Sequence, residues 1–306
     1  MAKLVFLFVH NGVPLVLAVI AWRWRPCSWV GLMAGAAFFA AVAVFLFLWG
    51  QWPLAGSHYA RLLTMVLLAV TAWSAWRGIR DGLRPWHGGM LPTAGSVLLA
   101  VLAGYALYGA AGLVAGRDYP GPFVDLEFPL RDGRYYVSAG GSRPIINNHM
   151  RVPASAQDYA IDINKLGPLG GASRNILAPD NELHHIFGEP VYAPCGGTIV
   201  EAANHVDDNA GSTMDVDPAE GLGNYVIIDC NKTFIWLAHL RSGSVRVSEG
   251  DVVAAGEPIG QAGNSGFSQE PHLHIQAARF DENRKLYPVA MRFDGRAPVR
   301  NDVIPN

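Results

Sequence analysis

Four long apolar runs occupy the first third of this 306-residue chain, and they constrain its fold more than any other feature of the sequence. Residues 29–52 and 91–115 contain no charged side chain. A bilayer core is crossed by about 20 apolar residues in helical conformation, so runs of this length are typical of membrane-spanning helices. The sequence therefore predicts an α-helical membrane region at residues 1–116. Its four transmembrane helices are expected at about residues 4–21, 29–50, 60–76 and 91–115.

The loops between the four runs differ in positive charge, which indicates how the region is oriented in a bilayer. Cytoplasmic loops carry an excess of arginine and lysine. The first and third loops hold most of the arginines, namely Arg23, Arg25, Arg77, Arg80 and Arg84, whereas the second holds Arg61. Both termini are then expected outside, although Lys3 argues weakly for the reverse. We expect a multi-pass protein of the inner (cytoplasmic) membrane whose C-terminal part is extracytoplasmic (periplasmic).

The first run allows a second interpretation. It could be a signal peptide cleaved after Ala21, but Arg23 and Arg25 follow immediately and would then lie on the translocated side. Its polar pair, His10 and Asn11, stands beside a glycine and a proline, and we expect the pair to satisfy a local kink or a helix contact. A polar residue inside a membrane is a functional candidate. The sequence nevertheless assigns no role to the membrane-region histidines His10, His58 and His87.

The pattern of residues changes after the fourth run. Pro120, Gly121 and Pro122 predict a short stiff linker at residues 117–123. From residue 124 to residue 306, short alternating segments are separated by Gly, Pro, Asn and Asp, and no long helical period occurs. Strands are expected at residues 124–130, 135–138, 159–163, 191–193, 197–202, 224–228, 234–239, 252–253 and 272–276. The expected fold is all-β, an antiparallel barrel or sandwich.

Residues 245–261 look like the strand–turn–strand of biotinyl and lipoyl carriers. A carrier needs a lysine at the tip of that hairpin, and no lysine lies between Lys232 and Lys285. We therefore expect a geometry related to the biotinyl/lipoyl barrel hybrid without the attachment chemistry. The formal net charge of −2 lacks the basic signature of nucleic-acid binding, so no nucleic-acid partner is expected.

A pair of histidines near the C-terminal end is the strongest chemical signal. Pro271 precedes His272-Leu273-His274-Ile275-Gln276 and favours an extended backbone before it. In a strand, His272, His274 and Gln276 share one face, while the two aliphatic side chains share the other and enter the core. Two imidazoles on one face can serve as a zinc ligand and a neighbouring acid or base. A pair of surface or core-edge histidines is the alternative.

Several segments occur in an order that is typical of one enzyme family. They are Asn148-His149, residues 159–163 (Tyr-Ala-Ile-Asp-Ile), residues 188–197, residues 223–228, residues 236–240 (Trp-Leu-Ala-His-Leu), and residues 263–266 (Gly-Asn-Ser-Gly) followed by the histidine pair. Together they resemble the LytM/lysostaphin-type zinc endopeptidases, which cut peptide bonds in peptidoglycan. The resemblance covers roughly residues 123–287.

The resemblance implies one zinc ion per chain, held by His149, Asp162 and His274. It also implies that His239 and His272 are the catalytic histidines. Better-known members have the first histidine and the aspartate four residues apart, whereas thirteen positions separate His149 from Asp162 here. Asp158 is therefore the alternative carboxylate ligand. Strand alternation supports the assignment, because it places Asp162 opposite Ile161 and Ile163, and His239 opposite Trp236, Ala238 and Leu240.

Other polar groups are interpreted as solvated. These are His184, His185 and His205, together with an acidic insertion at residues 205–220 that contains Asp207, Asp208, Asp215, Asp217 and Glu220. The insertion could instead wall the substrate cleft or bind calcium. Cys195 and Cys230 each lie at the end of an expected strand, and in an oxidising compartment we expect them to form a disulfide. Two separate core cysteines are the alternative.

The expected function is that of a membrane-anchored zinc metalloendopeptidase whose partners are a peptidoglycan peptide substrate and the lipid bilayer. Three protein ligands leave a fourth position open, as catalytic zinc sites do. A non-catalytic protein that binds peptidoglycan or activates a hydrolase through the same groove is the main alternative. A transport or sensing role centred on the membrane region is a third. Non-catalytic relatives that only bind peptidoglycan or activate a hydrolase usually lack metal ligands, whereas here all five expected site positions are filled.

Overall fold

The computed structural model describes residues 2–84, 90–151, 156–210, 216–217 and 220–305. The chain divides into two compact units, Met1–Ala115 and Gly116–Asn306. His87 and Asp215, which the sequence analysis considered, lie outside the described residues.

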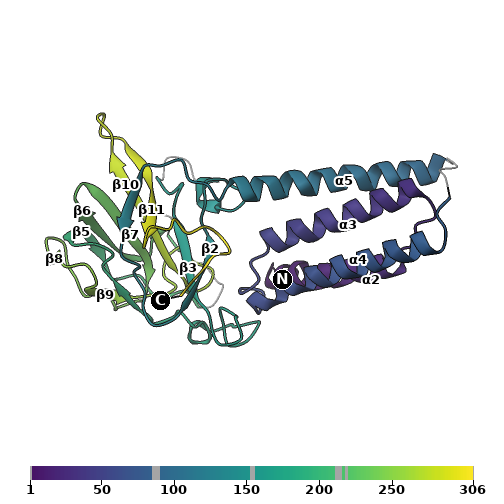
Figure 1. Ribbon diagram of the computed structural model, residues 1–306. Helices are drawn as coiled ribbons and strands as arrows, with labels where there is room; N and C mark the ends of the chain where they lie inside the picture. Colours follow the sequence, from purple (N-terminus) through teal and green to yellow (C-terminus); the bar gives the residue numbers. More distant parts are fainter. Residues whose placement is uncertain (1, 85–89, 152–155, 211–215, 218–219, 306) are drawn as a thin grey trace. The chain divides into compact units, whose positions relative to one another are not determined.

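The N-terminal unit is helical (Figure 1). Its described helices are α1 (Ala2–Leu7), η1 (Phe8–Gly12), α2 (Val13–Arg23), α3 (Trp29–Trp49), η2 (His58–Arg61), α4 (Leu62–Arg80) and α5 (Met90–Ala115). α3 packs against α4 and α5, and α2 packs against α4. Four helical stretches are long and apolar enough to cross a membrane: Lys3–Arg23, Trp29–Trp49, His58–Arg80 and Thr93–Ala115. The third continues to Arg80, beyond the end expected at residue 76.

The first of these stretches changes its helical pitch at the polar pair. Residues Phe8–Gly12 form a π-helical turn between α1 and α2. His10 is buried, its Nδ1 lies 2.8 Å from the Phe6 carbonyl oxygen, and its Nε2 accepts a hydrogen bond from the Gln51 N–H at 3.1 Å. Asn11 donates to the Ala55 carbonyl at 3.0 Å. The pair thus ties the first helical stretch to the chain that follows α3, which confirms the expected structural role.

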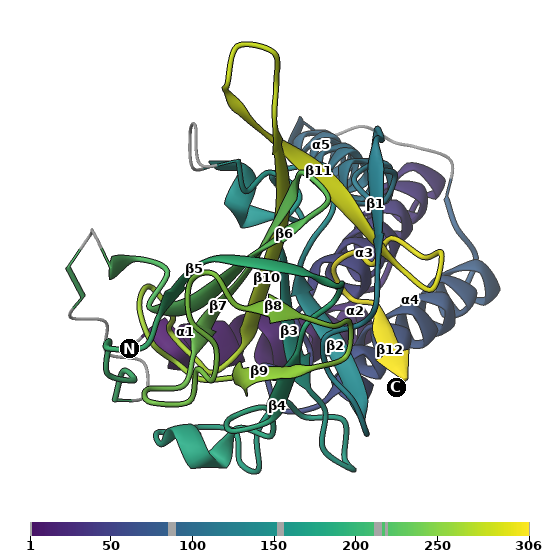
Figure 2. The ribbon, with the colours of Figure 1, turned by 90° about the vertical axis from the view of Figure 1, so that its left-hand side faces the viewer.

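The C-terminal unit is built on one large β-sheet (Figure 2). Its described strands are β1 (Phe123–Leu126), β2 (Arg134–Ala139), β3 (Ile161–Lys165), β4 (Pro190–Tyr192), β5 (Gly197–Ala203), β6 (Asn224–Cys230), β7 (Thr233–Leu240), β8 (Val252–Val253), β9 (Pro258–Gln261), β10 (Leu273–Phe280), β11 (Leu286–Phe293) and β12 (Val303–Pro305). The main path runs β12-β2-β3-β10-β7-β6-β5-β8, with neighbours antiparallel.

Two further pairings complete the unit. β11 pairs antiparallel with β10 and parallel with β1. β4 and β9 form a separate two-stranded sheet. β12 and β8 end the main path without pairing to each other, so the described strands form an open, mainly antiparallel sheet and not a closed barrel. The relation of residues 245–261 to biotinyl and lipoyl carriers stays a prediction.

One face of the sheet carries the hydrophobic core. Ile161 and Ile163 of β3 and Leu273 and Ile275 of β10 are buried in it, together with Leu237 of β7. Burial of each such side chain stabilises the fold by roughly 1.5–3 kcal/mol. Because strand side chains alternate, burial of these residues turns their neighbours to the opposite face. That opposite face carries the polar cluster described below.

Two strands of the C-terminal unit were not expected from the sequence, whereas its disulfide was. β11 and β12 were not expected; β11 contains Pro288, which removes one backbone donor and weakens the strand pattern. Cys195 and Cys230 form a disulfide with their Cα atoms 6.1 Å apart, which confirms the expected pair. The remaining cysteine, Cys27, is free and exposed.

Candidate metal centre and active site

Asp162 and His274 face each other across two paired strands. In the antiparallel ladder of β3 and β10, His274 stands directly opposite Asp162. Both side chains leave the sheet on the face away from the core, because their neighbours along each strand are core residues. His274 Nδ1 lies 3.1 Å from Asp162 Oδ1. The two groups are therefore positioned by regular backbone pairing rather than by a loop.

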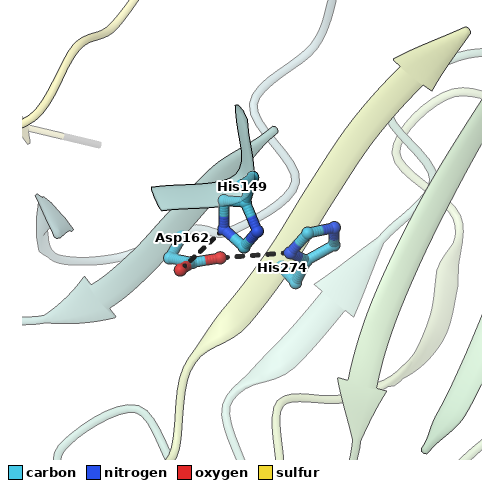
Figure 3. A group of neighbouring side chains, drawn as sticks. All are labelled: His149, Asp162 and His274. Carbon is cyan, nitrogen blue, oxygen red and sulfur yellow. Dashed lines mark hydrogen bonds and ion pairs between the residues drawn. The ribbon is translucent and has the colours of Figure 1, made fainter. Parts of the chain in front are cut away.

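His149 reaches the same place from a short 3₁₀ helix, η3 (Asn148–Arg151). Its Nε2 lies 3.0 Å from Asp162 Oδ2, and its ring centroid lies 4.7 Å from that of His274. Figure 3 shows the carboxylate of Asp162 joined by dashed lines to both imidazoles. One nitrogen or oxygen atom from each of His149, Asp162 and His274 lies within 4.8 Å of the other two. The longer spacing between His149 and Asp162 in the sequence thus still brings them together.

The donor set fits a zinc ion. Two imidazole nitrogens and one carboxylate oxygen are ordinary zinc ligands. The contact between His149 and Asp162 is short but lacks hydrogen-bond geometry, so the buried His149 Nε2 has no hydrogen-bond partner among the described residues. His274 Nε2 lies 2.9 Å from Gln276 Oε1, an acceptor, so its proton is held there and the Nδ1 lone pair faces Asp162. This is how a ligand histidine is usually oriented by a neighbouring acceptor.

Burial and the neighbouring charges shift the pKa values of all three residues. Burial alone would raise the pKa of Asp162, but the imidazoles of His149 and His272 hold it well below its usual range. Burial would lower the pKa of His149, yet the Asp162 carboxylate outweighs it and the pKa is raised. Burial is also the main reason that the pKa of His274 is lowered. The Asp162 carboxylate therefore favours the protonated form of His149, and a bound cation would compete with that proton.

Two more histidines border the cluster. His272 Nε2 lies 3.6 Å from Asp162 Oδ1, and the His239 ring centroid lies 4.8 Å from that of His272 and 5.7 Å from that of His274. His239 Nδ1 lies 2.8 Å from the Ser265 carbonyl, and His272 Nδ1 lies 2.8 Å from the Glu270 carbonyl. A carbonyl only accepts, so each Nδ1 carries the proton and each Nε2 is free to accept another. Burial, with His272 and His274 nearby, lowers the pKa of His239 well below its usual value.

His239 reaches this cluster through an irregularity in β7. Simple alternation would place it on the face of Leu237, which is a core residue. The pairing of β6 and β7 shifts register between Asn224 and Val226, and the backbone of His239 has a φ of 59°. An extra residue in a strand re-aims the side chain beside it. The expectation that His239 shares a face with Leu237 was therefore wrong, although the structure still brings His239 to the other histidines.

Other polar residues from the sequence analysis have different positions. Asp158 does not belong to the three-residue group; its backbone carbonyl accepts from the Asn147 amide at 2.9 Å. His184 is only 5% exposed, so the expectation that it is solvated was wrong; its backbone bridges to Ser173 and its Nε2 lies 3.3 Å from the Ala178 carbonyl. His185 is half-buried, whereas His205 is exposed and pairs with Glu220 at 3.5 Å.

The acidic insertion is only partly solvated. Asp207 and Asp217 are exposed. Asp208 is half-buried, and its two carboxylate oxygens accept from the Asn264 N–H at 2.7 Å and the Ser242 N–H at 3.1 Å. Burial raises the pKa of Asp208. This carboxylate therefore fastens the loop that precedes the histidine pair, a structural role that charge pattern alone does not reveal.

The residues that orient the histidines were not identified from the sequence. Gln276 was placed on the correct face by alternation, but its bond to His274 was not foreseen. Ser268 Oγ lies 3.1 Å from His272 Nδ1. Asn147 accepts from the His149 N–H at 3.2 Å. The only sequence signal for these residues is their closeness to the histidines along the chain.

Comparisons with known proteins agree with this geometry. Residues 182–287 match the model of peptidase family M23, a range that includes His239, His272 and His274 and begins after Asp162. The chain is 28% identical over 151 residues to the peptidoglycan DD-endopeptidase ShyA of Vibrio cholerae serotype O1, covering 48% of this chain and 30% of ShyA. It is 24% identical over 149 residues to ShyB of the same organism, covering 49% of this chain and 32% of ShyB.

Among solved structures, the catalytic domain of the antimicrobial peptidase lysostaphin from Staphylococcus simulans is 29% identical. The match covers 36% of this chain and 78% of that domain, with a TM-score of 0.24. The chain spans about a third of the length of the curated relatives it matches. The match of residues 182–287 to peptidase family M23 and the similarity to two peptidoglycan endopeptidases together support the assignment of the C-terminal unit to the LytM/lysostaphin-type peptidases.

Proposed function

We propose that this chain is a membrane-anchored zinc metalloendopeptidase that hydrolyses peptide bonds in peptidoglycan. The observation that carries the proposal is the convergence of His149, Asp162 and His274, with two further imidazoles beside them. The match of residues 182–287 to peptidase family M23 supports a peptidase, and the relatives ShyA and ShyB are named peptidoglycan DD-endopeptidases. Four apolar helical stretches and the arginine distribution support an inner-membrane anchor with a periplasmic catalytic domain.

His149, Asp162 and His274 would hold the zinc ion, through the two imidazole nitrogens that face the carboxylate and through the carboxylate itself. When bound, zinc supplies Lewis-acid chemistry, which polarises a carbonyl oxygen and acidifies water. The Asp162 side chain is mostly buried and its pKa is held well below its usual range, so its negative charge is available to a cation. Gln276 keeps the proton of His274 on the far ring nitrogen.

His239 and His272 would provide the proton transfers and the hydrogen bonds of hydrolysis. Both hold their proton on Nδ1 against a backbone carbonyl, so both present Nε2 as the acceptor. His239 is neutral at pH 7 because its pKa is lowered. A neutral imidazole can take a proton from water and return it to the leaving amine. An imidazole that has taken the proton can then donate a hydrogen bond to a developing oxyanion.

A non-catalytic protein that uses the same groove to bind peptidoglycan is the second candidate. It requires the same fold but not the complete set of five polar side chains. The retention of all five, with the protons of three imidazoles fixed by neighbouring acceptors, favours the enzyme.

Digestion of purified sacculi by the full chain in detergent micelles tests the proposal. Mass spectrometry of the released fragments identifies the bond that is cut. The Asp162→Asn chain is the matched control, because it keeps the shape of the side chain and removes the charge. We expect cleaved crosslinks with the unmodified chain and none with the control. Zinc-loaded protein that binds sacculi and leaves every peptide bond intact would establish the binder instead.

A further inference from the structure

Two asparagines outside the five site residues have the same unusual surroundings. The side-chain amide of Asn147 donates to three backbone carbonyls, those of Gly141 at 3.0 Å, Asp158 at 2.9 Å and Ala160 at 3.1 Å. The side-chain amide of Asn209 also donates to three, those of Asn264 at 2.7 Å, Gly266 at 2.7 Å and Ser268 at 3.0 Å. Asn147 is 0% exposed and Asn209 is 8% exposed. The carbonyls around Asn147 come from two separate segments, whereas those around Asn209 belong to one loop.

Asn147 joins the two segments that carry the first two metal-ligand candidates. Its Oδ1 accepts from the backbone N–H of His149, at the start of η3. Its amide holds the carbonyl of Ala160, the residue directly before β3, which carries Asp162. The side chain of Asn147 thus fixes the start of η3 relative to the start of β3.

Asn209 holds the loop that orients the other pair of histidines. The Ser265 carbonyl, which takes the Nδ1 proton of His239, lies between two of the carbonyls that the Asn209 amide binds. The third carbonyl belongs to Ser268, whose hydroxyl contacts His272 Nδ1. The backbone N–H of Asn209 adds a bond to the Asn264 carbonyl at 3.0 Å. Asn209 lies in the acidic insertion, beside Asp208, which binds the same loop.

We propose that Asn147 and Asn209 are positioning residues for separate halves of the site. Asn147 sets the distance between His149 and Asp162 and thereby the metal affinity. Asn209 sets the loop at residues 264–268 and thereby the proton position and orientation of His239 and His272. The inference rests on the proposed function only for the consequence in hydrolysis. A buried amide is required at both positions, because carbonyls without donors are costly and a carboxylate would repel them.

Cobalt(II) binding and histidine NMR on the full chain in detergent micelles test this division. Cobalt alone, titrated into metal-free protein and followed by its visible absorbance, reports the affinity of the metal half. Imidazole ¹⁵N shifts in protein labelled at histidine report which ring nitrogen of His239 and His272 carries the proton. Asn147→Ala should weaken cobalt binding by about 10–100-fold, as expected when a residue that supports a ligand is lost. It should leave the ¹⁵N shifts of His239 and His272 unchanged.

Asn209→Ala should give the opposite result, with unchanged cobalt affinity and loss of the single Nδ1-protonated form of His239. A misplaced catalytic group lowers turnover by up to about 100-fold, so the kcat of the Asn209→Ala variant on sacculi should fall while its KM stays unchanged. Asn204 offers a matched control: it is exposed, and its side chain bonds to the backbone of Val245 on both sides. Asn204→Ala should change neither readout. Asn→Ser variants, which keep one short donor, replace any alanine variant that does not fold.

The proposal is overturned if each asparagine variant disturbs both readouts together, because that is the effect of general destabilisation. It is equally overturned if neither variant moves its readout, or if the unmodified chain binds no cobalt. Failure of the proposed function has a different signature. In that case sacculi stay intact with the unmodified chain, while cobalt affinity and the histidine shifts still respond separately to the two variants.

Discussion

Asp162 Oδ1 lies 3.1 Å from His274 Nδ1, and the two residues are direct partners across the β3–β10 ladder. The regular pairing of β3 and β10 therefore positions both side chains. Ladder hydrogen bonds and the core residues on the opposite face hold the two proposed ligands in place. The fold is therefore expected to persist when zinc is removed, and ligand variants can be compared in folded protein.

The first prediction separates the two candidate carboxylates. Asp162→Asn should remove most of the bound zinc, because it leaves two imidazoles without the charge that pairs with the cation. Asp158→Asn, the matched control, should keep its zinc. Zinc per chain, measured by inductively coupled plasma mass spectrometry on both purified variants, decides the matter. A zinc-free Asp158→Asn chain beside a zinc-loaded Asp162→Asn chain would reverse the assignment.

The second prediction concerns His239 and His272, the two histidines proposed to be catalytic. His239→Asn and His272→Asn should retain zinc and lower the rate of hydrolysis by roughly 10²–10⁴-fold, the usual contribution of a positioned acid or base. Asparagine is chosen at residue 239 because it tolerates the positive φ of 59° better than alanine does. Zinc content and rate should be measured on the same preparations. Loss of zinc from either variant would place that imidazole among the ligands.

The third prediction is a maximum in the stability of the metal-free chain near pH 6.5. Because the pKa of His149 is raised in the folded chain, its protonation adds to the free energy of unfolding. This contribution is fully present below pH 6.5 and is lost as the pH rises through the pKa of the folded state. The lowered pKa values of His239 and His274 act in the other direction, because below pH 6.5 the unfolded chain binds protons that the folded chain does not. The stability from the lowered pKa of Asp162 is fully present above pH 3.8 and is lost only below it, so it does not affect this maximum.

Thermal unfolding of metal-free protein between pH 5 and pH 8 tests these signs. Below pH 6.5 each of the two imidazoles removes up to about 1.4 kcal/mol of unfolding free energy per pH unit. His239→Asn should therefore reduce the acidic slope and leave the alkaline arm unchanged. If the free energy of unfolding falls equally steeply below pH 6.5 in the unmodified chain and in His239→Asn, the burial of His239 does not contribute to that fall.

The sequence predicted the site better than the elements that orient it. Alternation correctly placed Asp162, His272 and His274 on one face, because β3 and β10 are regular where they pair. It failed for His239, because the bulge that turns this side chain depends on pairing with β6, which no local pattern of β7 contains. β11 was missed because Pro288 weakens a strand pattern that only tertiary pairing restores.

The supporting residues were missed for a similar reason. Asn147 and Asn209 act through carbonyls of segments that are as many as 59 residues away along the chain, so their role exists only in the folded protein. The charge of Asp208 suggested solvation, whereas its surroundings supply two backbone donors. In contrast, the pairing of Cys195 with Cys230 followed from their places at the ends of two strands.

The fourth prediction uses Cys27 as an internal reference for the disulfide. Without reductant, one thiol per chain should be alkylated, that of the exposed Cys27; after reduction, all three should react. Intact-mass analysis of denatured protein counts the adducts. Replacing Cys195 and Cys230 together by alanine should lower the free energy of unfolding by about 2–5 kcal/mol. Three adducts without reduction would show that the pair is not oxidised in the cell.

The last prediction concerns topology, on which both the wall substrate and the disulfide depend. By the arginine distribution, the loops after the first and third apolar runs face the cytoplasm. An alkaline phosphatase, which is active only outside the cytoplasm, should be active when fused after Asn306 and inactive when fused after Arg80. Cys27 lies in the first loop, so a maleimide that cannot cross membranes should label it in broken cells and not in intact cells with a permeabilised outer layer. A phosphatase that is active only after Arg80 would place the C-terminal unit inside the cell, where it could reach neither peptidoglycan nor an oxidising compartment. That result would remove the proposed substrate while leaving the metal site intact.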